Sequence, residues 1–181
     1  MRLCELKLRN FRNYEDVRLE FDPGVNLILG ENAQGKTNLL EAVFYLSAGH
    51  GFRTRKEAEL IRFGADFADL EASVACADRE RSLRAVLFAG RRPRQLFLNG
   101  VRQKSFAELR GVLHTVLFCP EDLLILKSGS ANRRRLLDVA LCQLRPGYER
   151  ALEEYNRLLE QKSRILKDWR DQPGLVDLLP E

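Results

Sequence analysis

The feature that most constrains this chain is the segment at residues 30–37, Gly-Glu-Asn-Ala-Gln-Gly-Lys-Thr. It fits the pattern G-x-x-x-x-G-K-[S/T], a loop whose backbone N–H groups surround the phosphates of a nucleotide. Gly30 and Gly35 can adopt backbone conformations that other residues resist, which lets successive N–H groups point inward. The Lys36 ammonium group suits the β- and γ-phosphates, and the Thr37 hydroxyl suits Mg²⁺. The segment therefore predicts binding of a nucleoside triphosphate.

The residues on both sides of this phosphate loop support the interpretation. Residues 25–29 form a short apolar run, which is typical of a buried strand that leads into such a loop. Residues 38–46 are largely apolar and compatible with a helix that ends near Gly49. The positive N-terminal end of that helix would face the bound phosphates. A glycine turn without a ligand is the alternative, but the order of strand, loop and helix favours phosphate binding.

The composition indicates a soluble globular chain. Of its 181 residues, 45% are hydrophobic and 31% are charged, which suits one domain with a hydrophobic core. No apolar run approaches the ~20 residues that span a bilayer, and the N-terminus lacks the apolar block of a signal peptide. We therefore expect a cytoplasmic protein without membrane contact. Four cysteines far apart in sequence predict reduced, mostly buried thiols rather than a zinc site; they are Cys4, Cys76, Cys119 and Cys142.

Basic residues occur in clusters, and the formal net charge is +4. The clusters lie at residues 53–56, 79–84, 91–94 and 133–135. Groups of this kind can neutralise the phosphates of a polynucleotide. The alternative for any single cluster is an ordinary solvated surface. Together the clusters favour nucleic acid as a partner without establishing it.

Short segments on both sides of the phosphate loop alternate between apolar and polar side chains, as half-buried strands do. They are residues 3–8, 17–21, 70–76 and 83–88. A turn at residues 11–14 joins the first two, and the Asn99-Gly100 pair predicts a hairpin. We expect an antiparallel pair of strands before the loop and a separate antiparallel sheet after the helix.

The C-terminal part of the sequence has a helical pattern. Ser130 or Asn132 is expected to cap a helix that runs to about Leu144 and stops at Pro146. A second helix is predicted from an apolar stripe over residues 148–169. The stripe indicates a packed helical lobe, and a short coiled-coil stem is the alternative.

The sequence lacks the acidic strand of a nucleoside triphosphatase, in which an Asp after four apolar residues holds Mg²⁺ and places the base. Residues 112–118 predict an apolar strand, but Pro120 separates it from Glu121 and Asp122. Asp138 follows two leucines inside a helical pattern. The L-S-G-G type of signature is also missing from the sequence. We therefore expect the chain as given to bind a nucleotide without hydrolysing it.

These motifs resemble the RecF family of bacterial recombinational-repair ATPases, which have an ABC-type head related to SMC proteins. The resemblance rests on segments in the same order: residues 11–14, 30–42, 52–54, 118–123, 133–138 and 155–159. It implies an α/β fold, a P-loop NTPase of ABC/SMC-head type with an antiparallel β subdomain and the start of a helical lobe. The implied domains are an ATP-binding subdomain over residues 1–127 and the beginning of the lobe over residues 128–181.

The resemblance also implies ligands and partners. These are ATP and Mg²⁺, single-stranded DNA and gapped or junction duplex, and the RecR and RecO proteins. The implied role is recombinational repair at single-strand gaps and stalled forks, in replication, recombination and the SOS response. Family members are longer, so this chain is expected to be an N-terminal portion. Weak ATPase activity and ATP-dependent homodimers are then properties of the full-length protein, in which a partner head supplies the signature residues.

The candidate nucleotide-binding residues come from the loop and from the turn at residues 11–14. They are Arg12, Asn13, Gly30, Glu31, Asn32, Ala33, Gln34, Gly35, Lys36, Thr37 and Asn38. The resemblance places Arg12 and Asn13 near the base and ribose, and a plain surface turn is the alternative. Thr37 is the candidate Mg²⁺ ligand. Glu121 and Asp122 are candidates for sensing the metal or the attacking water, with a helix cap as the alternative. No catalytic residue is assigned.

Two other functions remain open from the sequence. A P-loop phosphotransferase, acting on a small molecule or a nucleotide, would use residues 133–135 in a lid over its acceptor. The strands before the phosphate loop argue against it, because small nucleotide kinases usually open on the strand that feeds the loop. The other possibility is an interaction platform that contacts DNA and partner proteins without turnover.

Overall fold

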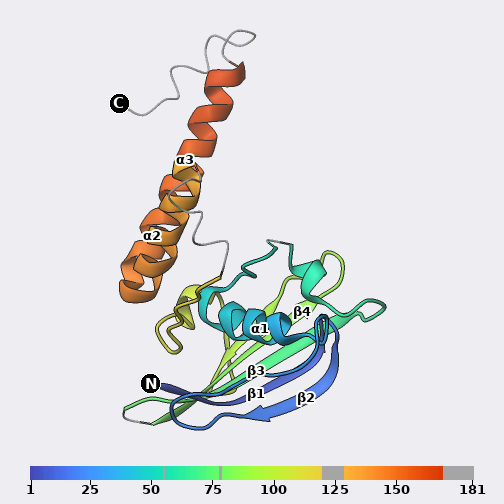
Figure 1. Ribbon diagram of the computed structural model, residues 1–181. Helices are drawn as coiled ribbons and strands as arrows, with labels where there is room; N and C mark the ends of the chain where they lie inside the picture. Colours follow the sequence, from blue (N-terminus) through green and yellow to red (C-terminus); the bar gives the residue numbers. More distant parts are fainter. Residues whose placement is uncertain (55, 78, 120–128, 169–181) are drawn as a thin grey trace.

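The computed structural model describes residues 1–54, 56–77, 79–119 and 129–168, and in these residues six antiparallel strands form one sheet (Figure 1). The strand order is β2-β1-β3-β4-β5-β6. The strands are β1 (Arg2–Phe11), β2 (Tyr14–Glu20), β3 (Phe67–Ala75), β4 (Glu80–Phe88), β5 (Gln95–Leu98) and β6 (Val101–Gln103). All four alternating segments of the sequence are strands, as predicted. The hairpin at Asn99 and Gly100 is also confirmed, with φ of 50° and 76°.

Strand β1 joins the two groups of strands that the sequence predicted separately. Leu8 of β1 is paired with Val17 of β2 on one side and with Leu70 of β3 on the other. The prediction of a separate sheet after the first helix is therefore wrong. Strand β3 repeats the alternation of β1, so their pairing extends one apolar face, which a single layer of covering residues can bury.

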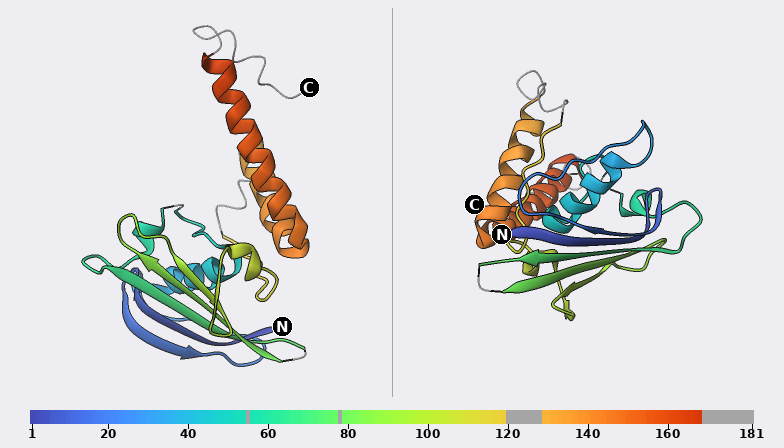
Figure 2. Two further views of the ribbon diagram at one scale, coloured as in Figure 1. Left: turned by 180° about the vertical axis from the view of Figure 1, so that it is seen from behind. Right: turned by 60° about the horizontal axis from the view of Figure 1, so that its bottom comes forward.

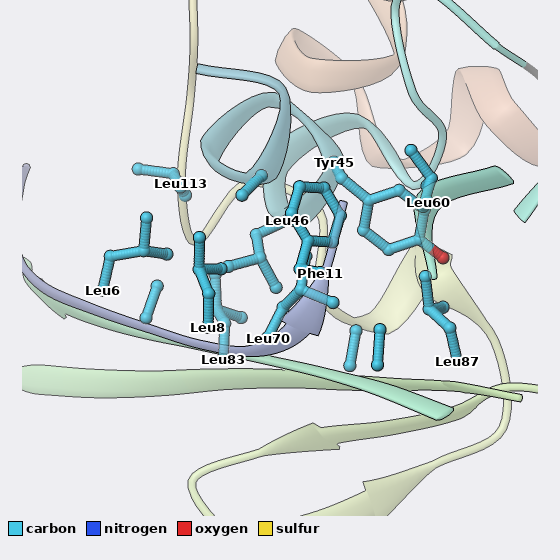
Figure 3. Packing of buried hydrophobic residues seen from close by; sticks show 14 of the residues in the cluster. Leu6, Leu8, Phe11, Tyr45, Leu46, Leu60, Leu70, Leu83, Leu87 and Leu113 are labelled. Carbon is cyan, nitrogen blue, oxygen red and sulfur yellow. The ribbon is translucent and has the colours of Figure 1, made fainter. Parts of the chain in front are cut away.

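Helix α1 (Lys36–Ala48) covers this apolar face, as Figure 3 shows from close by. Tyr45 and Leu46 are fully buried in one cluster with Leu8 and Leu70 of the sheet. Burying a leucine side chain of this kind contributes roughly 1.5–3 kcal/mol. The helix ends where the Gly49 N–H bonds the Tyr45 carbonyl at 2.8 Å, with φ of 78° at the glycine. The predicted helix and its end are confirmed.

Two strands that the sequence predicted are missing. Residues 25–29 and 112–118 are not strands. Val25, Leu27 and Leu29 are 94%, 76% and 78% exposed. An apolar strand of this type is buried only when neighbouring strands satisfy its backbone on both edges. In the described part of the chain no strand pairs with either segment. The patterns are those of buried strands, but the partners they need are not among these residues.

Two short 3₁₀ helices and two long helices complete the part of the chain that the structure describes. They are η1 (Glu57–Leu60), η2 (Phe106–Glu108), α2 (Ser130–Leu144) and α3 (Pro146–Asp168). The prediction that Ser130 or Asn132 caps α2 is wrong, because Gly129 is the capping residue and its carbonyl accepts the Asn132 N–H at 3.2 Å. Helix α2 ends at Leu144 as predicted, but Arg145 is the residue between the helices, and α3 begins at Pro146, since proline suits the first helical position.

Gln143 attaches helix α2 to the rest of the molecule. Its side-chain oxygen accepts the Ser47 hydroxyl at 3.2 Å and the Thr115 N–H at 2.8 Å, and its amide donates to the Thr115 carbonyl at 3.2 Å. Helix α3 projects beyond α2, away from the sheet (Figure 2). Tyr155 and Leu159 are exposed, so the described residues leave much of the predicted apolar stripe uncovered. Among the helices described, none has the length and apolar character needed to cross a membrane.

The cysteines differ in burial from the prediction. Only Cys142 is buried among the four, and burial raises the pKa of its thiol. Cys4, Cys76 and Cys119 are half-buried, so the expectation of mostly buried thiols is wrong for them. Cys4 lies where the pairing of β1 with β3 shifts register, which interrupts the alternation between inward and outward side chains.

Candidate nucleotide-binding site

The phosphate loop, residues 30–37, leads directly into helix α1. Gly30, Ala33 and Gly35 all have positive φ, at 149°, 68° and 101°. Gly35 is the capping residue of α1, and no side chain caps the helix there. The first N–H groups of a helix have no partner within the helix, and together with the helix dipole they attract anions. The sequence motif therefore folds into a loop that ends at an uncapped helix N-terminus.

Lys36 lies across the loop and holds it closed. Its Nζ donates to the carbonyls of Gly30 and Glu31, both at 2.6 Å. An ammonium group has three donors, and two of them have partners in the described part of the chain, so a third can face an acceptor outside the protein. Thr37 is the second residue of α1 and is exposed to solvent. Both candidate side chains thus lie at the start of α1, next to the uncapped N–H groups.

The turn between β1 and β2 packs on the phosphate loop. The Asn13 side-chain amide donates to the Gln34 carbonyl at 3.1 Å, and the Tyr14 hydroxyl donates to the Gly35 carbonyl at 3.2 Å. Asn38 donates to Asn13 Oδ1 at 2.7 Å. A Cβ at Gly35 would lie only 2.5 Å from Asn13 Nδ2, so this approach requires glycine. Residues 13 and 34 are far apart in sequence, and the fold brings these two predicted parts of the site together.

A buried carboxylate that no sequence motif assigns to the site is linked to the loop through neighbouring side chains. Glu41 is 0% exposed, and its Oε2 is 2.9 Å from both Nε and Nη2 of Arg12. Arg53 Nη2 is 2.6 Å from the same oxygen. The signal in the sequence was the position of Glu41 between apolar residues of a buried helix, where a carboxylate needs cationic partners. By sequence alone, Arg53 belongs to the basic cluster at residues 53–56.

Several arginines of the basic clusters have structural partners in the fold. Arg84 bonds both carboxylate oxygens of Asp69, at 2.9 Å and 2.6 Å. Arg94 donates to the Gly49 carbonyl at 2.8 Å and forms an ion pair with Glu57. These side chains support the sheet and the end of α1. A count of basic residues therefore overstates the number that face a polynucleotide.

Burial also affects a tyrosine in this region. The Tyr45 hydroxyl donates to Glu57 Oε1 at 2.7 Å and lies 3.2 Å from Arg94 Nη1. Burial raises the pKa of Tyr45, and the Coulombic effect of Arg94 opposes the rise. The hydroxyl therefore stays protonated and holds η1 against α1. Glu121 and Asp122, the candidate metal-sensing acids, lie outside the described residues.

Comparison with protein families finds one model that matches most of the chain. Residues 5–178 match the family described as an AAA domain. The DNA replication and repair protein RecF of Acetivibrio thermocellus is 38% identical over 183 residues, which cover 99% of this chain and 48% of the relative. RecF of Agathobacter rectalis is 41% identical over 179 residues, covering 99% and 49%. The chain thus spans about half the length of the curated relatives it matches.

Solved structures agree with these matches. A structure of the recombination mediator protein RecF-ATPrS in the RecFOR pathway superposes with a TM-score of 0.92 and 36% identity, over 98% of this chain and 49% of that chain. A RecF-ATP structure has a TM-score of 0.84 and 38% identity, over 91% of this chain and 44% of that chain. The SMC head domain from Thermotoga maritima has a TM-score of 0.52 and 24% identity, over 61% of this chain and 41% of that chain. This similarity shows the shared fold. The chain belongs to the AAA domain family, with the P-loop fold of ABC and SMC heads, and its resemblance to RecF is confirmed.

Proposed function

We propose that the chain is the ATP-binding portion of a recombination mediator that acts on DNA. The observation that carries this proposal is the phosphate loop: Lys36 closes it, Asn13 packs on it, and it ends at the uncapped N-terminus of α1. Solved structures described as RecF-ATPrS and RecF-ATP are similar to the chain over nearly all its length, which supports ATP as the ligand.

The residues present fit the groups of a nucleoside triphosphate. The spare donor of Lys36 and the uncapped N–H groups of α1 suit the phosphate oxygens. The exposed Thr37 hydroxyl suits Mg²⁺, which when bound neutralises phosphate charge. Arg12 and Asn13 are proposed to lie near the base and ribose. The loop residues Glu31, Asn32, Ala33 and Gln34 would contribute mainly through their backbone.

Hydrolysis is proposed only for the full-length protein. A second head would supply the signature residues to the same nucleotide, so ATP would promote a homodimer. Glu121 and Asp122 are proposed to sense the metal or the attacking water. The strands β1 and β2 before the loop favour such a head over a phosphotransferase, since the SMC head domain shares the fold.

DNA, RecR and RecO are proposed partners of the full-length protein. The relatives are described as DNA replication and repair proteins, and one similar structure as a member of the RecFOR pathway. Arg91, Arg92 and Arg102 are exposed in and beside the β4 to β6 strands, and they are better candidates for phosphate contacts than Arg84 or Arg94. Binding to gapped duplex should weaken as salt increases, because phosphate contacts release counterions. Binding that is independent of salt would contradict this part of the proposal.

The test of nucleotide binding is a titration of the chain with ATP and Mg²⁺ before and after Lys36→Ala. The variant loses the cation and the closed loop, so we expect at least a hundredfold weaker binding, about 2.7 kcal/mol. Lys56→Ala is the matched control, because that side chain is 82% exposed and, among the described residues, forms an ion pair with Glu59 at 3.8 Å. ATP affinity that survives Lys36→Ala unchanged would make the assignment of the loop wrong.

A further inference from the structure

Glu41 is a fully buried carboxylate that cannot touch a nucleotide. It lies within helix α1, between the phosphate loop and the core, and its exposed fraction is 0%. Burying a carboxylate is costly unless cations and hydrogen bonds compensate it. An apolar side chain at this position of a buried helix would avoid that cost. The charge at Glu41 therefore calls for an explanation beyond packing.

Both oxygens of Glu41 bond to groups from other segments. Arg12, in the β1–β2 turn, approaches Oε2 with two nitrogens at 2.9 Å, while its Nη1 donates to the Glu59 carbonyl at 2.7 Å. Arg53, after α1, places Nη2 at 2.6 Å from Oε2 and its backbone N–H at 3.3 Å from Oε1. One carboxylate thus fixes two guanidinium groups that come from different parts of the chain.

The same array is continuous with the phosphate loop. Arg53 Nη2 also donates to Asn38 Oδ1, and Asn38 donates to Asn13 Oδ1 at 2.7 Å. Asn13 in turn donates to the Gln34 carbonyl at 3.1 Å. The Arg53 side chain is 41% exposed, so solvent reaches it beside the loop. A chain of side-chain contacts therefore runs from the buried carboxylate to the backbone of the phosphate loop.

We propose that Glu41 is a positioning residue for nucleotide binding, which holds Arg12 and Arg53 ready beside the phosphate loop. The inference rests on the proposed function, in that the ligand is ATP bound at residues 30–37. Two positive charges stand against one negative charge, so the array stays attractive to phosphate. Arginine side chains that are already ordered spare the nucleotide the cost of ordering them. Neutralising Glu41 adds one net positive charge to the array, but water and salt screen a charge at this exposed edge of the site. The loss of arginine ordering therefore outweighs the added charge, and ATP binding weakens overall.

The test compares Glu41→Gln in two backgrounds. In the otherwise unchanged chain, Glu41→Gln should weaken ATP binding about tenfold. In the Arg12→Ala/Arg53→Ala background, the same change should alter ATP affinity less than about twofold, because residues that act together are not additive. A tenfold loss in both backgrounds, or no loss in either, would overturn the proposal.

A matched control separates positioning from general destabilisation. Glu149 is also buried, and its Oε2 is 2.5 Å from Arg110 Nε, away from the loop. Glu149→Gln removes a comparable buried charge, and ATP affinity should stay within about twofold. Equal weakening by Glu149→Gln and Glu41→Gln would overturn the proposal.

A second variant keeps the test decisive if Glu41→Gln does not fold. Arg53→Lys retains the charge at a half-exposed position but cannot bond Glu41 and Asn38 with one planar group. We expect it to weaken ATP binding nearly as much as Arg53→Ala, and affinity equal to the unchanged chain would count against the proposal. Lys36→Ala reports on the loop itself. Loss of binding in Lys36→Ala with none in the Glu41 and Arg53 variants would reject this inference alone.

Discussion

The side-chain amide of Asn13 donates to the backbone carbonyl of Gln34 at 3.1 Å and so joins the β1–β2 turn to the phosphate loop. The turn belongs to the antiparallel sheet, whose core is fully buried, whereas the loop is exposed. This bond therefore links a solvent-exposed segment to one that is anchored in the sheet. Its consequence is that the conformation of the loop depends on residues some twenty positions earlier in the chain.

Asn13→Ala should weaken ATP binding without unfolding the sheet. The variant removes the bonds to Gln34 and Asn38, and each hydrogen bond contributes about 1 kcal/mol, so we expect a fall of about five- to thirtyfold in ATP affinity. Calorimetric titration measures it. Asn26→Ala is the control, because within the described residues that side chain bonds the backbone of Asp22 in an exposed turn. If both variants bind ATP alike, the Asn13 contact has no role in the site.

Gly35→Ala should be more destabilising than Gly24→Ala. Both glycines have similar φ, 101° and 99°. A Cβ at Gly35 would lie 2.5 Å from Asn13 Nδ2, whereas a Cβ at Gly24 would have no described atom within 4 Å. Strained backbone alone costs roughly 1–2 kcal/mol. Chemical denaturation should show a larger fall in the free energy of unfolding for Gly35→Ala than for Gly24→Ala. Adding Asn13→Ala to Gly35→Ala should recover part of that fall. Equal losses at the two glycines would show that the close approach is relaxed at little cost.

Tyr45→Phe should change how stability depends on pH at alkaline values. The pKa of Tyr45 is raised from its ordinary value of 10.0 by burial, so the folded state keeps the phenol proton after the unfolded state loses it. The contribution of the protonated Tyr45 to the free energy of unfolding is fully present below about pH 10. It is lost as the pH rises further, by about 1.4 kcal/mol per pH unit. Denaturation at pH 8 to 11 should show a steeper fall for the unchanged chain than for Tyr45→Phe. Parallel curves would contradict this.

Leu46→Ala should test the core that supports α1. Leu46 is fully buried in the cluster between the helix and the sheet, so the change leaves a cavity and should lower the free energy of unfolding by about 2–5 kcal/mol. Leu27→Ala, at an exposed position, should change it by less than about 0.5 kcal/mol. A large effect at Leu27 would mean that the segment at residues 25–29 is buried in solution.

The local elements of the fold could be predicted from the sequence. The phosphate loop, the helix that ends at Gly49 and the hairpin at Asn99 and Gly100 all have signals within a few neighbouring residues. Alternation of apolar side chains located β1 to β4 because period two is a property of a single strand. The continuous apolar runs at residues 25–29 and 112–118 predicted strands that are absent, since an apolar run does not supply the partner strands.

The sequence alone therefore determined helices α1 to α3, the strands β1 to β4 and the hairpin at Asn99 and Gly100, and that the loop at residues 30–37 suits a phosphate. The tertiary structure decided how these segments contact one another: β1 pairs with β3, and Glu41 forms ion pairs with both Arg12 and Arg53. These contacts join segments that are distant along the chain. They depend on which apolar faces are buried together and on which cations reach a buried carboxylate, and no short stretch of sequence contains that information.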